Sequence, residues 1–226
     1  MPEQSLSVGI IMDGNRRYAK GQGLPAFEGH VRGYKKLREL VLWAKELRVT
    51  HLTVYAFSTE NWKRTQDEVE LLMTLFERAI GEMIERSKRE GICMRFIGDR
   101  KMCSHQLLAI IEKAESETSE ENALMLTIAL SYGGRDELLR AIRKLPKDML
   151  EKLTEEELSG YLDTKENPDP NIIIRTGGER RLSNFLVWQS IYSELYFTDT
   201  LWPDFSKKEF TAALTWYQSR ERKNGA

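Results

Sequence analysis

Short runs of branched and aromatic residues alternate along the chain with longer stretches in which apolar residues recur every three or four positions. The short runs predict strands, at residues 7–12, 51–57, 92–97, 124–130 and 171–175. The longer stretches predict amphipathic helices, at residues 34–47, 68–89, 106–118 and 135–145. Because strand and helix alternate, we expect an α/β fold whose parallel sheet is covered on both faces.

Two further helices are predicted by the residues at their amino ends. Thr154 with Glu157, and Ser206 with Glu209, have the spacing of a capping box, in which each side chain satisfies a free amide at the other position. We therefore expect helices to begin directly after Thr154 and Ser206. The segment 165–170, with the sequence KENPDP, predicts a loop because its prolines and the residues before them disfavour helix.

The helices predicted at 34–47 and 68–89 each carry an apolar stripe, and two interpretations of these stripes stay open. An amphipathic stripe normally packs against the protein core. Part of the same surface would instead form the wall of an apolar tunnel, together with Ala56 and Leu124. The sequence alone does not divide the stripes between these two roles.

The composition is typical of a chain that folds around one core. Its 226 residues, 41% of them hydrophobic, predict one domain over residues 1–226. A formal net charge of -1 argues against nucleic acid as a partner and leaves anion binding as a local property. The apolar run 8–12 is too short for a signal peptide or a membrane span, so we expect a cytoplasmic protein. Cys93 and Cys103 lack metal-ligand spacing, which favours free thiols.

Polar motifs follow the carboxyl ends of nearly all the predicted strands, and the first of them centres on Asp13. In an open parallel sheet, ligands bind at this edge because loops and helix amino ends gather there. Asp13 is followed by Gly14, Asn15, Arg16 and Arg17. The arginines suit a phosphate, but the carboxylate would repel it unless a divalent cation lay between them, and we infer Mg²⁺. The alternative is that Asp13 caps a helix while the arginines are solvated.

A second motif, Arg175-Thr-Gly-Gly with Arg181 and Ser183, follows the strand predicted at 171–175. Two guanidinium groups, a hydroxyl group and two glycines that let backbone amides approach closely suit a diphosphate. The alternative is a surface turn that happens to contain arginines. Neither a P-loop nor a Rossmann glycine motif occurs, which makes nucleotide binding a minor alternative.

A third motif follows the strand predicted at 51–57 and mixes donors, acceptors and a large aromatic ring. Its members are Ser58, Glu60, Asn61, Trp62, Arg64 and Glu68. Ser58 has no histidine near it in the sequence and no G-x-S-x-G motif around it, so a nucleophilic role is disfavoured. Positioning and proton transfer fit this group better. His30 is a candidate phosphate contact, and we expect His51 and His105 to have no part in the site.

Five motifs in a fixed order resemble the cis-prenyltransferases, the family of undecaprenyl and dehydrodolichyl diphosphate synthases. They are IIMDGNRRYA, EGHVRG, VYAFSTENWKR with EVELLM, SYGGRDEL, and IRTGGERRLSNFLVWQSIYSELYFTDTLWPDF. The resemblance covers nearly the whole chain. It implies a six-stranded parallel sheet flanked by helices, a hydrophobic tunnel for the growing prenyl chain, and a homodimer or heterodimer, of which we expect the homodimer.

The resemblance also implies roles for the residues at matching positions. Asp13 matches the essential metal-linked acid, and Glu194 matches an acid associated with Mg²⁺. The positions that match the cradle for the allylic diphosphate are Gly14, Asn15, Arg17 and His30. The positions that match the catalytic loop are Ser58, Glu60, Asn61, Trp62, Arg64 and Glu68, with Ser58 and Asn61 beside Asp13 as the catalytic set. The positions that match the groups holding isopentenyl diphosphate are Arg175, Arg181 and Ser183.

The implied activity is a Mg²⁺-dependent transfer of a prenyl group from an allylic prenyl diphosphate to isopentenyl diphosphate, which forms a Z double bond. Mg²⁺ and the cations would stabilise the departing diphosphate. A lipid product also implies peripheral contact with a membrane. Arg16 stands in the GNRR form of eukaryotic and archaeal members, which suggests an atypical, archaeal-type member, and we place Arg16 with the substrate-binding residues.

Three positions depart from the family pattern. Ser7 replaces a histidine, Ala26 replaces an expected arginine, and Lys223 begins a Lys-Asn-Gly segment in place of Arg-x-Gly. Because lysine does not reproduce the fork of arginine, weaker diphosphate binding is expected. The alternatives are therefore an atypical member that makes short products or uses another acceptor, and a noncatalytic subunit of a heteromeric enzyme. A phosphate-ester hydrolase is disfavoured because no nucleophile or water-activating histidine stands in the predicted site.

Overall fold

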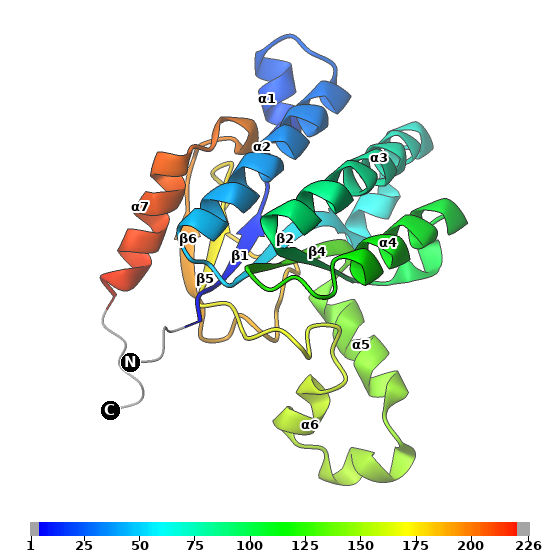
Figure 1. Cartoon of the computed structure of the whole chain (residues 1–226). Coiled ribbons are helices and arrows are strands. Elements are labelled where there is room, and N and C mark those ends of the chain that lie inside the picture. The colour runs from blue at the N-terminus through cyan, green and yellow to red at the C-terminus, as the bar shows by residue number, and fades with distance from the viewer. Residues whose placement is uncertain (1–4, 221–226) are drawn as a thin grey trace.

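The computed structural model describes residues 5–220 and contains one sheet of six parallel strands (Figure 1). The strands are β1 Ser7–Ile11, β2 His51–Ser58, β3 Ile92–Ile97, β4 Leu124–Tyr132, β5 Ile172–Arg175 and β6 Glu194–Phe197. Their order across the sheet is β3-β4-β2-β1-β5-β6, and every neighbouring pair is parallel. The predicted α/β fold with a parallel sheet is confirmed. The apolar pattern predicted five of these strands, whereas β6 was implied only by the family resemblance.

The helices lie between the strands along the chain, as the alternating pattern predicts. The α-helices are α1 Asn15–Gly21, α2 Ala26–Glu46, α3 Gln66–Glu90, α4 His105–Glu117, α5 Gly134–Lys144, α6 Glu155–Ser159 and α7 Lys207–Gln218. The 3-10 helices are η1 Thr59–Lys63, η2 Arg100–Met102, η3 Lys147–Lys152 and η4 Trp202–Asp204. Both predicted capping boxes are present, so α6 and α7 begin where the sequence indicates. Cys93 and Cys103 are free cysteines.

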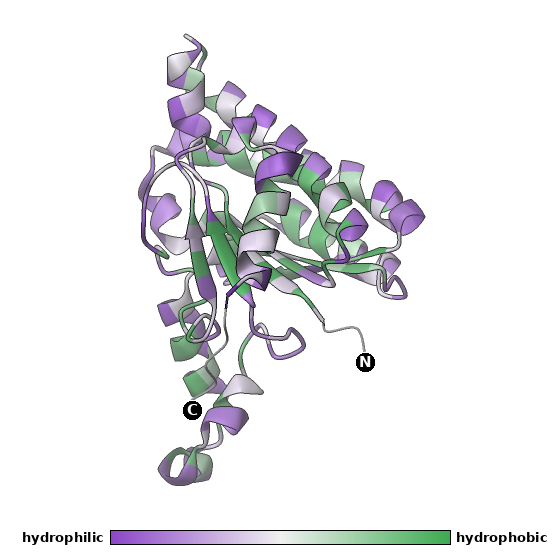
Figure 2. Ribbon diagram, turned by 90° about the vertical axis from the view of Figure 1, so that its left-hand side faces the viewer, coloured by the Kyte–Doolittle hydropathy of each residue, from purple (hydrophilic) through white to green (hydrophobic). Residues whose placement is uncertain are grey.

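The two faces of the sheet are covered differently. The larger core cluster joins α2, α3, α4 and α7 to one face, with residues such as Leu40, Ile84 and Phe210 buried between helix and strand. The opposite face is covered around Phe185 and Leu186 by an irregular segment rather than by long helices. Figure 2 shows the hydrophobic strands inside and the hydrophilic outer surfaces of the helices. Both faces are buried, as predicted, because all five residues of β1 are buried.

The helix predicted at 34–47 in fact begins eight residues earlier, at Ala26. Glycine disfavours helix interiors, and Gly29 and Gly33 therefore concealed this first part of α2. Here glycine is required by packing, because a Cβ at Gly29 would lie 2.0 Å from the carbonyl oxygen of Asn15. A Cβ at Gly33 would lie 2.2 Å from the Asn15 side-chain oxygen. The two glycines thus bring α1 against α2.

The helices α5 and α6 extend away from the sheet (Figure 1) and bury a separate small cluster that contains Ala141, Leu145, Leu158 and Leu162. The predicted loop 165–170 leads from this region to β5. No helix within residues 5–220 is both long and apolar enough to cross a membrane.

Candidate functional site

A cavity of about 670 Å³ opens at the carboxyl edge of the sheet, beside the ends of β1, β2 and β5. Parallel strands place the residues that follow them at one common edge, which is why segments distant in sequence meet here. Ten of the predicted site residues line the cavity: Asp13, Asn15, His30, Ser58, Glu60, Asn61, Arg64, Arg175, Arg181 and Ser183. The three motifs therefore line one cavity.

Asp13 lies between two guanidinium groups. Its Oδ1 is 3.1 Å from Nη2 of Arg17, and its Oδ2 accepts a hydrogen bond of 3.0 Å from Nη2 of Arg175. The alternative that Asp13 caps a helix is wrong, because Gly14 is the N-cap residue of α1 and no side chain caps that helix. Gly14 has a φ of 117°, which places it in the left-handed region that glycine tolerates best. This turn directs the Asp13 carboxylate toward the arginines.

Arg175 is the most buried charge of the site, with 5% of its side chain exposed. Its Nη1 donates to Oγ of Ser183 at 2.8 Å and also to the backbone oxygen of Arg181. Its Nε is buried and has no hydrogen-bond partner within residues 5–220. An orphaned donor on a buried cation favours an anionic ligand at this point.

The RTGG loop lies directly against the Asp13 turn. A Cβ at Gly177 would lie 2.6 Å from Nη2 of Arg17 and 2.9 Å from the carbonyl oxygen of Asp13, so only glycine fits there. Arg181 has 60% of its side chain exposed and pairs with Glu179. The first and second motifs are thus in contact, and Asp13 of the first motif lines one cavity together with Arg175 and Arg181 of the second.

The third motif forms η1 and its flanks. The backbone amide of Ser58 donates to Oδ1 of Asn61 at 3.1 Å, so the side-chain oxygen of Asn61 stabilises the loop. Trp62 does not line the cavity: its indole N–H donates to Oγ of Ser131 at 2.9 Å, and its ring packs edge-on against Phe57. Trp62 therefore supports the loop from behind rather than touching the cavity.

Arg64 and Glu68 form an ion pair at 3.0 Å, and Arg16 lies 3.7 Å from the same Glu68 oxygen. Arg64 lines the cavity, whereas Arg16 and Glu68 do not. Burial lowers the pKa of Arg64 and the nearby Glu68 raises it, with a net decrease. One carboxylate therefore holds two cations in place beside the cavity without neutralising both.

His30 lies on α2 and contributes a ring nitrogen to the cavity wall. Its Nε2 is buried without a hydrogen-bond partner within residues 5–220. Burial, followed by the charges of Arg64 and Arg16, lowers the pKa of His30 to about 4, although Glu68 opposes this change. The imidazole is therefore neutral at pH 7. An anion beside it would raise the pKa and satisfy the nitrogen.

The donor set fits Mg²⁺ held mainly by a substrate. Within the described part of the chain there is no group of three or more His, Cys, Asp and Glu side chains that would enclose a metal ion. Mg²⁺ is commonly bound through one or two carboxylates together with substrate phosphates and water. Asp13, at the cavity wall and 30% exposed, is a hard oxygen ligand of that kind.

Glu194, the second acid that the family resemblance associates with Mg²⁺, lies away from the cavity that Asp13 lines. Glu194 begins β6 and pairs with Ile172, whereas the cavity lies at the other end of β5, beyond Arg175. Ile172, the partner of Glu194, lies three residues before Arg175, which is roughly 10 Å along the strand direction alone. One ion cannot contact both carboxylates of the same chain. The side chain of Glu194 instead lies 3.5 Å from Arg220.

An apolar cavity of about 80 Å³ adjoins the polar one and lies between α2, α3 and the sheet. Met12, Asn15, His30, Ala56 and Leu72 line both cavities, so the polar site leads into the apolar one. The stripes of the two long helices therefore serve partly as core and partly as cavity wall. Leu124 does not line the cavity, because it lies fully buried at the start of β4.

The three family departures lie in different places. Ser7 is at the amino edge of the sheet, where its amide donates to Asn171, and it is remote from the cavity. Ala26 is exposed in the first turn of α2, one turn before His30. Lys223 lies outside the described residues.

Sequence reasoning missed two polar residues of the cavity wall, Tyr55 and Asn184. Tyr55 lies inside β2, where an aromatic residue indicates only a strand, and its hydroxyl donates to the backbone oxygens of Tyr132 and Ser183. Asn184 directly follows Ser183, and an asparagine next to a binding serine was the available signal. Its Nδ2 donates to Glu60 at 3.1 Å.

Comparisons with known proteins agree with this geometry. The family described as "Putative undecaprenyl diphosphate synthase" matches residues 11–225. An isoprenyl transferase of Aquifex aeolicus is 46% identical over 218 residues, covering 96% of this chain and 94% of that protein. An isoprenyl transferase of Thermotoga maritima is 47% identical over 222 residues, covering 96% and 95%.

Two solved structures share the fold. Lavandulyl diphosphate synthase from Lavandula x intermedia, in complex with dimethylallyl diphosphate, superposes with a TM-score of 0.91 at 32% identity and covers 97% of this chain and 98% of that one. A probable undecaprenyl diphosphate synthase from Campylobacter jejuni has a TM-score of 0.82 at 33% identity, covering 99% and 100%. The chain therefore belongs to the cis-prenyltransferase family and is a prenyl transferase.

Proposed function

We propose that this chain is a Mg²⁺-dependent enzyme that joins an allylic prenyl diphosphate to isopentenyl diphosphate and forms Z double bonds. One observation carries the proposal: the Asp13 carboxylate, paired with Arg17 and Arg175, lines a polar cavity that adjoins an apolar one. A diphosphate head fits the first cavity, and a prenyl tail fits the second. The curated relatives named isoprenyl transferase support this assignment.

In this proposal the metal ion and the polar residues of the site have separate tasks. Asp13 would hold Mg²⁺ together with the substrate, and the ion would supply Lewis-acid stabilisation of the departing diphosphate. Arg17 and His30 hold the allylic diphosphate, while Arg175, Arg181 and Ser183 hold isopentenyl diphosphate. The allylic C–O bond breaks with its electron pair on the diphosphate, and the double bond of isopentenyl diphosphate forms the new C–C bond. Transfer of a proton from the resulting carbocation to the released diphosphate then leaves the new double bond.

The test is a product assay with the purified chain, labelled isopentenyl diphosphate and a set of allylic primers. Asp13→Asn keeps the size of the side chain but removes its charge, and it should lower kcat by roughly 10³-fold or more, since metal assistance contributes several kcal/mol. Asp148→Asn on η3, far from the cavity, is the matched control. Removal of divalent cations by EDTA should abolish turnover, and added Mg²⁺ should restore it. Near-normal turnover of the folded Asp13→Asn variant contradicts the metal role.

A second candidate, a short-chain product or another acceptor, is favoured by the departures from the family pattern at Ala26 and Lys223. The mass of the product separates the two candidates. A ladder of long polyprenyl diphosphates supports elongation, whereas a single short product supports the second candidate. Activity that appears only after a partner protein is added identifies the chain as a subunit of a heteromeric enzyme.

The proposed assembly is a homodimer formed through the edge of the sheet at β6. Ile191 and Tyr192 just before this strand have exposed fractions of 74% and 95%, and Leu195 on β6 has 39%. An exposed edge strand with apolar neighbours favours pairing with a second copy. Sedimentation of Tyr192→Lys against the unchanged protein tests this: a monomeric variant supports the interface, and an unchanged dimer places the interface elsewhere.

The proposed location is the cytoplasm, with peripheral contact to a membrane when the lipid product is released.

A further inference from the structure

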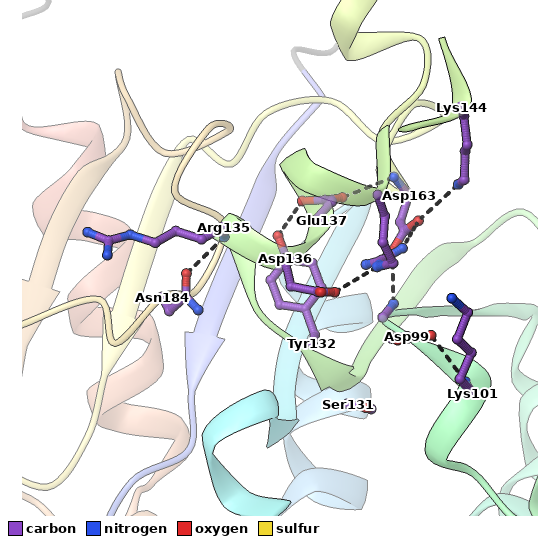
Figure 3. Close-up of polar contacts among 12 residues, drawn as sticks. Asp99, Lys101, Ser131, Tyr132, Arg135, Asp136, Glu137, Lys144, Asp163 and Asn184 are labelled. Atoms are coloured by element: carbon purple, nitrogen blue, oxygen red, sulfur yellow. Dashed lines mark hydrogen bonds and ion pairs between the residues drawn. The ribbon is translucent and has the colours of Figure 1, made fainter. Parts of the chain in front are cut away.

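Asn184 joins three parts of the site that are distant in sequence. Its Oδ1 accepts a hydrogen bond of 3.0 Å from the backbone amide of Arg135 at the start of α5. Its Nδ2 donates to Oε1 of Glu60 on η1 at 3.1 Å, and its own carbonyl oxygen accepts from the amide of Gly134 at 2.7 Å. Figure 3 shows Asn184 beside the backbone of Arg135. The side chain therefore links η1 to the loop that carries Arg181 and Ser183.

The backbone around Asn184 is held in an unusual conformation. Ser183 and Asn184 have φ angles of 49° and 65°, in the left-handed region that most side chains avoid. Asparagine tolerates this region better than most residues. A conformation of this kind persists only when surrounding contacts fix it. The bonds to Gly134 and Arg135 provide such contacts.

Hydrogen bonds on both sides of the Ser183–Asn184 peptide link connect Asp13 to Glu60. Asp13 accepts from Arg175, Arg175 donates to Ser183, and the next residue, Asn184, donates to Glu60. Both ends of this series line the cavity. The side-chain amide of Asn184 thus holds η1 at a fixed distance from the residues proposed to bind isopentenyl diphosphate.

The glycines of the SYGGRDEL motif make this contact possible. A Cβ at Gly133 would lie 2.6 Å from Oγ1 of Thr59 and 2.7 Å from Nδ2 of Asn184. Gly133 has an extended backbone that any residue adopts, so space alone requires glycine. Ser131 in the same motif accepts from Trp62, which is a second link between this segment and η1.

We propose that Asn184 is a positioning residue that fixes η1 relative to the Arg181–Ser183 loop, and thereby sets the separation of the two substrates. This inference rests on the proposed function. Asn184 acts through Glu60, because its side-chain oxygen is already used by the α5 backbone. An error of about 1 Å in the relative position of two reactants lowers the rate by roughly 10²-fold even when each still binds.

The principal variant is Asn184→Asp, which keeps the acceptor for Arg135 and tolerates the same backbone conformation, but places a carboxylate against Glu60. It should lower kcat about 10-fold to 100-fold while both KM values change by less than about threefold. The partner variants are E60Q and N184D/E60Q, in which an amide again faces a carboxylate. Because the two residues act together, their effects on kcat should fail to multiply.

A second, independent perturbation is Gly133→Ala, whose added methyl group would push Thr59 and Asn184 apart. It should reproduce the loss of kcat. The matched control is Gly81→Ala on α3, because a Cβ at Gly81 has nothing within 4 Å. Hydrogen exchange supplies a readout that does not depend on activity: exchange of segment 58–64 should rise in Asn184→Asp, while α4 is unchanged.

Two results would overturn the proposal. One is that the N184D and E60Q effects on kcat multiply within about twofold. The other is that exchange of segment 58–64 is the same with and without the substitution. If the unchanged protein makes no prenyl product at all, the proposed function fails, and the exchange measurement alone decides whether Asn184 holds η1.

Discussion

Neutral His30 makes the stability of this protein depend on pH in a defined direction. Burial is the largest cause that lowers the pKa of His30 to about 4, and Arg64 and Arg16 add to it. In the unfolded chain the imidazole has an ordinary pKa of about 6.5. Below pH 6.5 the unfolded state therefore binds more protons than the folded state, and the free energy of unfolding falls as the pH falls.

The size of this effect follows from the two pKa values. The difference between 6.5 and about 4 corresponds to roughly 3 kcal/mol, at about 1.4 kcal/mol for each pH unit. The stabilising contribution is fully present above pH 6.5, is lost progressively down to pH 4, and does not change further below it. At pH 4.5 most of the loss, about 2.5 kcal/mol, has occurred.

The assay is urea unfolding of the unchanged protein and of His30→Gln at a series of pH values from 7.5 to 4.5. The variant lacks the titrating group, so its free energy of unfolding should fall by about 2.5 kcal/mol less over this range. His51→Gln is the matched control, because burial lowers the pKa of His51 but that side chain lies away from the cavity. The free energy of unfolding of His51→Gln should depend on pH more nearly as that of the unchanged protein does.

Parallel curves for the unchanged protein and His30→Gln would refute the reasoning. An NMR titration in which the ring protons of His30 titrate near pH 6.5 would also refute it. The NMR measurement also decides the question if His30→Gln does not fold. Addition of inorganic diphosphate should move the titration of His30 to higher pH, because the anion favours the protonated ring.

Three further substitutions have expected outcomes. Gly33→Ala places a methyl group 2.2 Å from Oδ1 of Asn15 and should lower the free energy of unfolding by about 1–3 kcal/mol, measured by urea titration; unchanged stability would show that α1 moves freely. Arg175→Lys keeps the charge but loses the fork, and kcat/KM for isopentenyl diphosphate should fall roughly 10²-fold or more, with little change contradicting the role of the fork. Tyr132→Phe removes the donor at 2.6 Å to the buried Glu137 carboxylate and should cost about 1–3 kcal/mol of stability, which an unaltered melting temperature would disprove.

Several elements were predictable because their signals are local. Buried parallel strands such as β1 and β4 form continuous apolar runs, and capping boxes mark the starts of α6 and α7 through contacts only three residues apart. β6 was not predicted from its pattern because it has four residues and lies at the edge of the sheet with its side chains only partly covered. The beginning of α2 was concealed because Gly29 and Gly33 serve contacts with α1 rather than the helix itself.

The candidate site divides in the same way. That motifs follow the carboxyl ends of strands is a property of the sequence, and it was enough to expect Asp13 and Arg175 in one site. The direction of each side chain is a different matter. Trp62 turns behind the loop because its indole bonds to Ser131, which is more than sixty residues away in the sequence. Glu194 lies at the far end of its strand because β6 pairs with β5, which is about twenty residues away.

By itself, the sequence determined the α/β class, the order of most elements, the family and most of the polar residues that line the cavity. These follow from patterns that repeat over a few residues and from motifs with fixed spacing. Only the tertiary structure decided that Asp13 pairs with two arginines, that His30 is buried and neutral, and that Asn184 joins Glu60 to the start of α5. These properties depend on distances and burial between segments far apart in the chain, which only the packing of the folded protein fixes.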